Sequence, residues 1–268
     1  MSNLIIKVEA GSESHWYHED GTPQHRIEGV NGHERNTTLR DARKYKLLPS
    51  VTGIDKDVLT NFGVTKWYNG ILLEAAWTLP ASDKGEYDDF CDRVKADADQ
   101  FGADAREFGS QIHRSIDEFH GDKFFRPEPE LLPWFEKYKE WFDASIEEVI
   151  SSERRVVNMK HGYAGTMDML AKHINYDEPI LIDFKTQNMR KDKPNYYDSW
   201  IRQLAAYREC VNPHPRVMSV VINSKEPMDP FEKLWTDQET KTGWDVFRRA
   251  CEIWQLQRNY YPGGEEND

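Results

Sequence analysis

The pattern of hydrophobic and polar positions changes about halfway along the chain. From about Lys56 to Phe119, apolar residues recur at spacings of three and four, which predicts amphipathic helices broken near 79–86. A further helix is predicted over 129–146. The period then shortens, and runs rich in β-branched and aromatic residues predict strands. We expect strands at 151–159, 163–174, 179–187, 216–224 and 231–236, and helices at 199–211 and 243–261.

The beginning of the chain follows a different pattern. Residues 4–23 alternate and predict a β-hairpin, followed by a polar loop to about Leu48. Ser50 and Thr52 are both candidates for the N-cap of the first helix. The prediction is one domain, with an N-terminal hairpin and loop (1–48), a helical region (49–148) and a sheet core with a C-terminal helix (149–268). A mixed sheet flanked by helices is an α/β or α+β architecture.

Composition narrows the class of protein. The chain has 268 residues, 38% of them hydrophobic, and a mean hydropathy of -0.82, so we expect a soluble protein without a membrane segment. The N-terminus lacks the pattern of a secretory signal, which predicts a cytoplasmic location. The three cysteines are scattered, which argues against a disulfide framework, a zinc ribbon and an iron–sulfur cluster.

The net charge of -12 speaks against a protein that simply coats nucleic acid. It is compatible with an enzyme that uses clustered carboxylates to hold cations, provided that its binding channel is basic. Composition therefore leaves the function open.

The most informative segment is the strand at 179–187, which places Asp183 and Lys185 two apart inside an apolar run. Their side chains share one face, while Ile182 and Phe184 point to the other. Burying an unpaired charge costs several kcal/mol, so such residues need a partner. One interpretation is a structural ion pair; the other is a catalytic site.

The preceding strand carries Asp168 after two small residues. If the two strands are neighbours, the carboxylates of Asp168 and Asp183 converge, and a cation between them would relieve their repulsion. Oxygen ligands in this arrangement suit Mg²⁺ or Mn²⁺. With Lys185 beside a metal-activated water, the set is sufficient for hydrolysis of a phosphodiester.

The ordered pair of segments GYAGTMD and IDFKT resembles the PD-(D/E)XK nuclease superfamily, and in particular its RecB-type exonuclease branch. Phage exonucleases and the mitochondrial genome maintenance exonuclease belong to this branch. The resemblance covers roughly 49–207. It implies a restriction-endonuclease-like core, with Asp168 and Asp183 as metal ligands, Lys185 as the catalytic lysine and the backbone carbonyl of Phe184 as a further ligand.

Two other elements fit the same branch. His113 follows Gly109 by four residues on a predicted helix, which resembles the first motif, where the histidine binds metal. Gln203 and Tyr207 lie four apart on a later helix and therefore share a face. They match the Q-x-x-x-Y signature, which implies that they face the active site, orient Lys185 or contact DNA. A surface histidine and an ordinary amphipathic helix are the simpler alternatives.

Related enzymes often carry an acidic residue where this chain has Glu153, which makes it a further candidate metal ligand; a solvent-facing glutamate is the alternative. Basic and aromatic residues near these motifs are candidates for DNA contacts: Arg154, Arg155, Arg190, Lys191, Arg202 and Tyr207. Cations that follow the backbone and rings that stack on bases suit a single strand or a DNA end.

The sequence therefore predicts a DNA exonuclease dependent on Mg²⁺ or Mn²⁺, acting in replication, recombination or repair in a bacterial or phage-infected cell. A structure-specific endonuclease on the same fold and a non-catalytic DNA-binding accessory module are the alternatives. Digestion polarity, strand preference, DNA against RNA, the number of metals, protein partners and the oligomeric state stay open.

Overall fold

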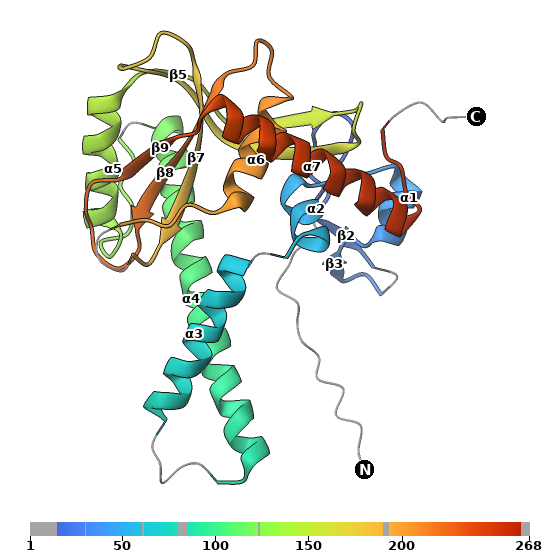
Figure 1. The fold of residues 1–268 in the computed structure, drawn as a ribbon, viewed down its shortest axis with the longest axis vertical. Coiled ribbons are helices and arrows are strands. Elements are labelled where there is room, and N and C mark those ends of the chain that lie inside the picture. The colour runs from blue at the N-terminus through green and yellow to red at the C-terminus, as the bar shows by residue number, and fades with distance from the viewer. Residues whose placement is uncertain are drawn as a thin grey trace. The chain divides into compact units, whose positions relative to one another are not determined.

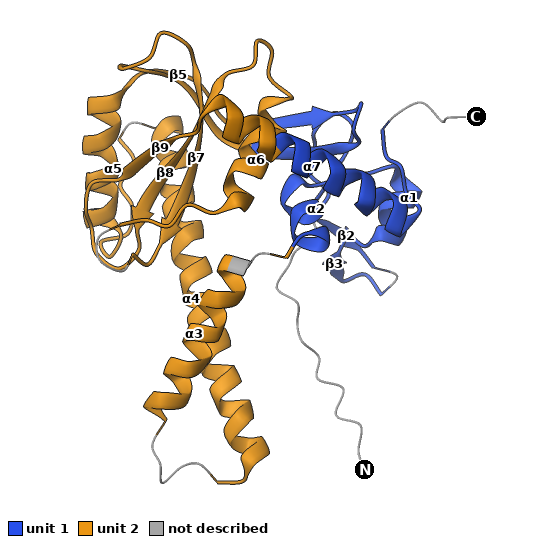
Figure 2. Cartoon of the chain, viewed as in Figure 1, with its two compact units in different colours: residues 1–59, 155–166, 244–268 blue, residues 60–154, 167–243 orange. Residues whose placement is uncertain are grey.

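The structure is a computed structural model that describes residues 15–29, 31–60, 62–79, 85–122, 124–189 and 193–263. The chain divides into two compact units (Figure 2). Unit 1 comprises residues 1–59, 155–166 and 244–268, and unit 2 comprises 60–154 and 167–243. The predicted single nuclease domain stays a prediction. Among the helices that the structure describes, none has both the length and the apolar character needed to cross a bilayer.

A five-stranded mixed sheet is the centre of the fold (Figure 1). Its strands lie in the order β5-β6-β7-β8-β9. They are β5 (Ile146–Asn158), β6 (Tyr163–His173), β7 (Ile180–Gln187), β8 (Arg216–Asn223) and β9 (Phe231–Leu234). The ends of β5 and β6 that face their connecting turn belong to unit 1, and the remainder of the sheet belongs to unit 2.

The central strand of this sheet is β7, which pairs antiparallel with β6 and parallel with β8. Met169 lies opposite Ile182 in the first pair, and Asp183 opposite Ser219 in the second. Parallel neighbours need a crossover connection, which here is the helix α6 (Asp198–Arg208). Strand β9 closes the edge by pairing antiparallel with β8.

One face of the sheet packs against α4 (Tyr87–Gly121) and α5 (Leu132–Ser145). The helices bury aromatic side chains against apolar residues of the three central strands, and together they form the main core. Its members include Ile112, Ile116 and Phe119 of α4, Phe135, Tyr138 and Trp141 of α5, and Ile182, Phe184, Met218 and Val220 of the sheet. Ile182 and Phe184 therefore face the core, as the strand pattern predicts.

Helix α6 covers the opposite face of β7 and β8. It is followed, after β8 and β9, by α7 (Asp237–Arg258), of which the first turns belong to unit 2. Gly243 on α7 lies so close to α6 that a Cβ atom there would come within 3.0 Å of the Ile201 carbonyl oxygen. The face of β7 that carries Asp183 is thus enclosed by a helix.

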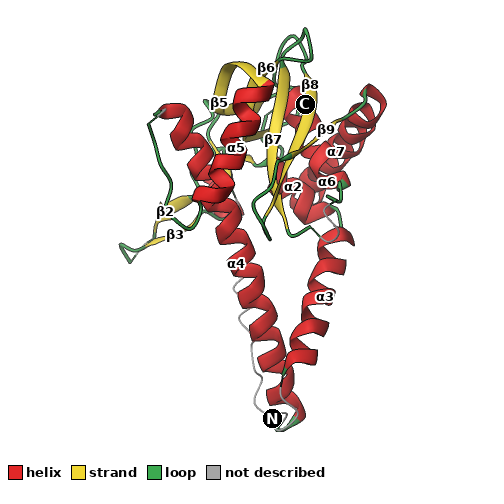
Figure 3. Ribbon diagram, turned by 90° about the vertical axis from the view of Figure 1, so that its left-hand side faces the viewer, coloured by secondary structure: helices red, strands yellow, loops and turns green. Residues whose placement is uncertain are grey.

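Helices α3 (Phe62–Thr78) and α4 form a helical hairpin that extends beyond the sheet of unit 2 (Figures 1 and 3). Its seam buries small and branched side chains, among them Ile71, Ala75, Val94 and Ala98. Tyr68 on α3 also donates a hydrogen bond to Asp99 on α4 at 2.7 Å. This hairpin is the helical insertion expected from the sequence.

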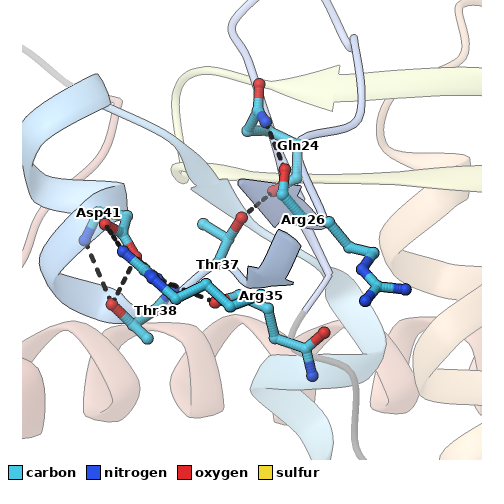
Figure 4. A network of polar contacts seen from close by, with 7 residues as sticks. Gln24, Arg26, Arg35, Thr37, Thr38 and Asp41 are labelled. Carbon is cyan, nitrogen blue, oxygen red and sulfur yellow. Dashed lines mark hydrogen bonds and ion pairs between the residues drawn. The ribbon is translucent and has the colours of Figure 1, made fainter. Parts of the chain in front are cut away.

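Unit 1 is built from short elements, and its polar network is shown in Figure 4. Its elements are β1 (Trp16–Tyr17), β2 (Arg26–Glu28), β3 (Glu34–Asn36), α1 (Leu39–Tyr45), β4 (Leu48–Pro49) and α2 (Val51–Val58). Arg35 donates two hydrogen bonds to Asp41, at 2.6 and 2.9 Å. Asp41 also accepts from the Thr38 backbone N–H, completing a capping box that begins α1. The Arg35 guanidinium lowers the pKa of Asp41.

The elements agree with the sequence pattern except at several boundaries. The first strand of the predicted hairpin lies outside the described residues, and the small hairpin that the structure shows is β2–β3, in the segment predicted as a polar loop. Strand β5 begins five residues earlier than predicted, and α7 begins six residues earlier. Ser50 is the N-cap of α2 and accepts from the Gly53 N–H at 3.0 Å.

Gly109 allows α4 to approach β7 closely. A Cβ atom at this position would lie 2.9 Å from Thr186 Oγ1, which is shorter than real side-chain contacts. Thr186 follows Lys185 directly, so the glycine sets the distance between α4 and the end of β7 that carries the lysine. By contrast, a Cβ atom at Gly70 on α3 would meet nothing within 4 Å.

We predict opposite effects for alanine at these two helical glycines. Gly109→Ala should lower the free energy of unfolding by about 1 kcal/mol or more, since the new methyl group overpacks the helix–strand contact. Gly70→Ala should raise it by about 0.5–1 kcal/mol, because alanine loses less backbone entropy in a helix. Urea unfolding of both variants measures this, and Thr186→Ala should recover most of the Gly109→Ala loss. Equal effects at the two sites would contradict the close approach.

Candidate functional site

Three residues from three elements of unit 2 bring metal-ligating atoms together. They are His113 on α4, Glu153 on β5 and Asp168 on β6, and their ligand atoms all lie within 4.8 Å of one another. His113 Nδ1 is 3.7 Å from Asp168 Oδ2. One imidazole nitrogen and two carboxylates on separate elements converge only through the tertiary fold, so the group is not a local run of acidic residues.

The orientation of Asp168 is fixed by the neighbouring strand. Its Oδ2 atom accepts a hydrogen bond from the Phe184 backbone N–H at 2.7 Å. The Phe184 ring points the other way and packs edge-to-face against Tyr138 and Trp141 in the main core. The core thereby holds the peptide that positions the carboxylate. The predicted role of the Phe184 carbonyl as a metal ligand stays a prediction.

Glu153 has an unusual backbone conformation for a residue in a strand. Its φ angle is 46°, in the left-handed region that costs a non-glycine residue of the order of 1–3 kcal/mol. This conformation interrupts the regular alternation of β5 and leaves the carboxylate within the group. Sites that retain such strain are often functional.

Desolvation and neighbouring negative charges both raise the pKa of Glu153. Although the residue is exposed, enough protein surrounds the carboxyl that desolvation, with the negative charges of Asp168 and Asp117, raises its pKa to about 7. Asp117 lies on α4 one turn after His113, and the sequence analysis did not identify it. The spacing of four residues from a candidate ligand is the signal that would have found it.

Lys185 is held by two partners on the face of β7 that α6 covers. Its Nζ atom donates to Asp183 Oδ1 at 2.9 Å and to Gln203 Oε1 at 3.0 Å. Gln203 Nε2 in turn donates to the Tyr207 hydroxyl at 3.4 Å. The structure thus places Gln203 against Lys185 and Tyr207 against Gln203, while the predicted part of both residues in an active site stays a prediction.

Asp183 is almost completely buried, with 1% of its surface exposed. Burial raises its pKa to about 6, with a further rise from the charge of Asp168, while Lys185 opposes the shift. Asp183 Oδ2 lies 2.7 Å from Lys185 Nζ, but it receives no hydrogen bond of good geometry. One buried carboxylate oxygen is thus incompletely satisfied.

Asp183 does not join the three-residue group of His113, Glu153 and Asp168. Its carboxylate instead bonds the lysine two positions along the same strand. Its role as a metal ligand therefore stays a prediction. Glu153, which the sequence analysis named as a further candidate ligand, is a member of the group.

This donor set fits a divalent cation. Two carboxylates and an imidazole offer the oxygen and nitrogen ligands that suit Mn²⁺ and, through the carboxylates, Mg²⁺. Glu153, whose carboxyl has a raised pKa, is a group that a bound cation would ionise. His113, Glu153 and Asp168 are the residues that would hold the ion.

The predicted DNA-binding residues differ in their accessibility. Arg154 is exposed in unit 2, and Arg155 is exposed in unit 1. Arg202 and Tyr207 are buried, with 9% and 4% of their surface exposed, and this burial does not favour a direct contact of either with phosphate. Arg190 and Lys191 lie outside the described residues.

Comparisons with known proteins add little. No family model matches the chain, and no curated protein matches its sequence. Among solved structures, a candidate exonuclease from Eubacterium rectale has a TM-score of 0.39 at 13% identity, with 84% of this chain and 87% of that chain covered. The crystal structure of SSO0001 has a TM-score of 0.26 at 18% identity. The match covers 41% of this chain and about half (51%) of that chain. Scores this low do not establish a shared fold.

The raised pKa values make cation binding depend on pH. The ordinary pKa values are 3.8 for aspartate and 4.5 for glutamate, whereas in the folded protein the pKa is about 6 for Asp183 and about 7 for Glu153. Between each ordinary pKa and the corresponding raised value, the folded state therefore binds more protons than the unfolded state. The free energy of unfolding falls as pH rises through this range. A cation that ionises Glu153 offsets the share of this loss that comes from Glu153, and protons displace the cation as pH falls below the Glu153 pKa of about 7.

We predict that Mn²⁺ raises the melting temperature more at pH 7.5 than at pH 5.5. Differential scanning calorimetry with and without the ion measures both shifts. Glu153→Gln should reduce the shift at pH 7.5, whereas Glu148→Gln, at an exposed glutamate of the same strand that pairs with Lys172, should leave it unchanged. A thermal shift that is independent of pH, or equally reduced in both variants, would contradict the assignment.

Proposed function

We propose that this protein is a divalent-metal-dependent deoxyribonuclease, acting as an exonuclease on DNA. The observation that carries the proposal is that His113, Glu153 and Asp168 converge next to a strand whose lysine is held by Asp183 and Gln203. Carboxylates, an imidazole and one fixed ammonium group are the components that phosphodiester hydrolysis requires. The order of the motifs along the chain, which resembles the RecB-type branch, supports the same proposal.

In this proposal, each residue around Lys185 has a separate role in the reaction. When bound, Mg²⁺ or Mn²⁺ would supply charge neutralisation at the phosphate and lower the pKa of a water molecule. Lys185 donates hydrogen bonds from a charged group and would stabilise the negative charge that develops on the phosphate. Asp183 and Gln203 fix the position of its ammonium group, and Tyr207 supports Gln203.

The Lys185 network favours an enzyme over a non-catalytic binding module. A lysine that only bound phosphate would be expected to stay hydrated at the surface, whereas the Lys185 side chain is 20% exposed and spans a buried carboxylate and an amide. Removing the ammonium group from water in this way costs free energy, and a protein that only bound DNA would not need to meet that cost. An endonuclease on the same scaffold would use the same residues, and only the substrate separates the two.

We predict that Lys185→Ala lowers the cleavage rate by about 10²–10⁴-fold while DNA affinity changes little, because the ammonium group acts on charge that develops during the reaction. Single-turnover cleavage of end-labelled DNA and a filter-binding assay in Ca²⁺ measure the two effects. Lys172→Ala is the matched control, since this exposed lysine of β6 pairs with Glu148. Full activity of Lys185→Ala would refute the catalytic assignment.

We expect Asp183→Asn to lose both metal affinity and cleavage, because the neutral amide neither holds Lys185 as an ion pair nor attracts a cation. Isothermal titration with Mn²⁺ and the cleavage assay test the two losses separately. An unchanged titration would count against Asp183 as a ligand and leave it the role of holding Lys185.

A comparison of linear and circular single-stranded DNA distinguishes an exonuclease from an endonuclease. We expect degradation of the linear form in Mg²⁺ or Mn²⁺, no degradation in EDTA, and no cleavage of the circle. Cleavage of the circle at a comparable rate would favour the endonuclease.

A further inference from the structure

Trp200, a partly exposed aromatic residue, lies one helical turn from Gln203, whose side-chain amide holds Lys185. Trp200, Gln203 and Tyr207 are spaced by three and four on α6 and therefore share one face of the helix. Gln203 accepts the hydrogen bond from Lys185, so this face is the one turned toward β7. Tyr196, just before the helix, contacts Trp200 with ring centroids 6.3 Å apart at 87°.

The Tyr196 ring packs against neighbouring aromatic rings but stays partly exposed to solvent. A second edge-to-face contact joins it to Trp235, whose ring centroid is 6.1 Å away. Trp235 is buried and donates its indole N–H to Ser219 at 3.0 Å, so it forms a rigid support. Tyr196 nevertheless leaves 37% of its surface in solvent. A ring that is fixed in position while more than a third exposed is suited to stacking.

A polar clamp ties these rings to the strand of Lys185. Gln187 shares a face of β7 with Asp183 and Lys185, because side chains alternate along a strand. Its Oε1 atom accepts from the Asn195 backbone N–H at 2.7 Å, and its Nε2 atom donates to the Asn195 carbonyl at 3.1 Å. Tyr196 follows Asn195 directly, so these two hydrogen bonds hold the chain just before Tyr196 against the end of β7.

The spacing of residues along α6 matches the spacing of nucleotides in a strand that passes Lys185. A helix rises about 1.5 Å per residue, so Trp200 lies about 4.5 Å along α6 from Gln203. This is close to the roughly 3.4 Å that separates stacked nucleotides in one strand. A base adjacent to a phosphate at Lys185 would therefore fall near the level of Trp200, whose ring contacts that of Tyr196.

We propose that Tyr196, supported by Trp200, is a stacking subsite for an unpaired nucleobase next to the scissile phosphate. The occupant is a base of single-stranded DNA, since a base inside a duplex does not present its face to a side chain. The inference rests on the proposed nuclease function and adds to it the substrate class: single strands, or ends whose terminal bases are unpaired. Stacking is tolerant of sequence, because every base has a π-face.

The test compares DNA with and without the base. One substrate is a fluorescein-labelled 20-mer of thymidylate, and in the others abasic nucleotides replace the two terminal nucleotides at the 5′ or the 3′ end. We expect wild-type protein to cleave the substrate with abasic nucleotides at the attacked end at least tenfold more slowly. Tyr196→Leu should slow cleavage of the unmodified strand by a similar factor and cause no further loss on the abasic strand. Tyr196→Phe should behave as wild type.

A binding measurement makes the test independent of cleavage. Trp200 gives the subsite its own fluorescence, so we expect thymidylate octamer to quench tryptophan emission in EDTA more than an abasic octamer does. Tyr196→Leu should remove this difference. Tyr176→Leu is the matched control, because Tyr176 is a partly exposed tyrosine that precedes the opposite end of β7.

The outcomes separate this inference from the proposed function. If wild-type protein cleaves normal and abasic strands equally, or if Tyr196→Leu slows both equally, the subsite is overturned and the nuclease assignment stands. If no substrate is cleaved in Mg²⁺ or Mn²⁺ but base-dependent quenching is present and lost in Tyr196→Leu, the function fails and the subsite stands. Equal quenching by both octamers overturns the subsite in either case.

Discussion

The ion pair between the buried Asp183 and the partly buried Lys185 is the constraint on which the candidate site depends. Strand β7 is central in the sheet, packed against the main core on one face and covered by α6 on the other, and it places a carboxylate and an ammonium group where water is largely excluded. Neither charge is tolerable there alone. The partners that satisfy them, each other and Gln203, determine which face of α6 must lie against the strand.

A second constraint is the close approach of α4. Gly109 lets this helix reach Thr186, and His113 one turn later arrives beside Asp168. The main core helps to position Asp168, because Tyr138 and Trp141 hold the Phe184 ring while the Phe184 backbone N–H donates to Asp168. The strained backbone of Glu153 completes the group from β5. The favourable packing of the main core and of the helix seams compensates for the free-energy cost of this strained backbone.

The sequence predicted the strands and helices of the sheet well, because their apolar periods are long and regular. The spacing of Gln203 and Tyr207 assigned both residues to one helical face, whereas a role for them beside Lys185 was implied only by the resemblance to the RecB-type branch. Boundaries were less accurate where polar residues extend an element, as at the start of β5 and α7. The burial of Arg202 was missed, because charge alone predicted a surface residue.

Other features of the site depend on tertiary geometry that a sequence pattern does not encode. The positive φ of Glu153 and the nearby charge of Asp117 are two such features. A third is the place of Asp183, whose carboxylate pairs with Lys185 and lies outside the three-residue group. The clamp of Gln187 on Asn195 joins residues eight apart through backbone atoms, for which neither residue type gives a signal.

The most direct test of the account is a crystal of the protein soaked in Mn²⁺, with an anomalous difference map recorded near the manganese absorption edge. The account predicts a strong peak coordinated by His113, Glu153 and Asp168 and close to the Lys185 ammonium group. A well-ordered site that lacks this peak at saturating Mn²⁺, or a peak bound by other residues, would contradict it.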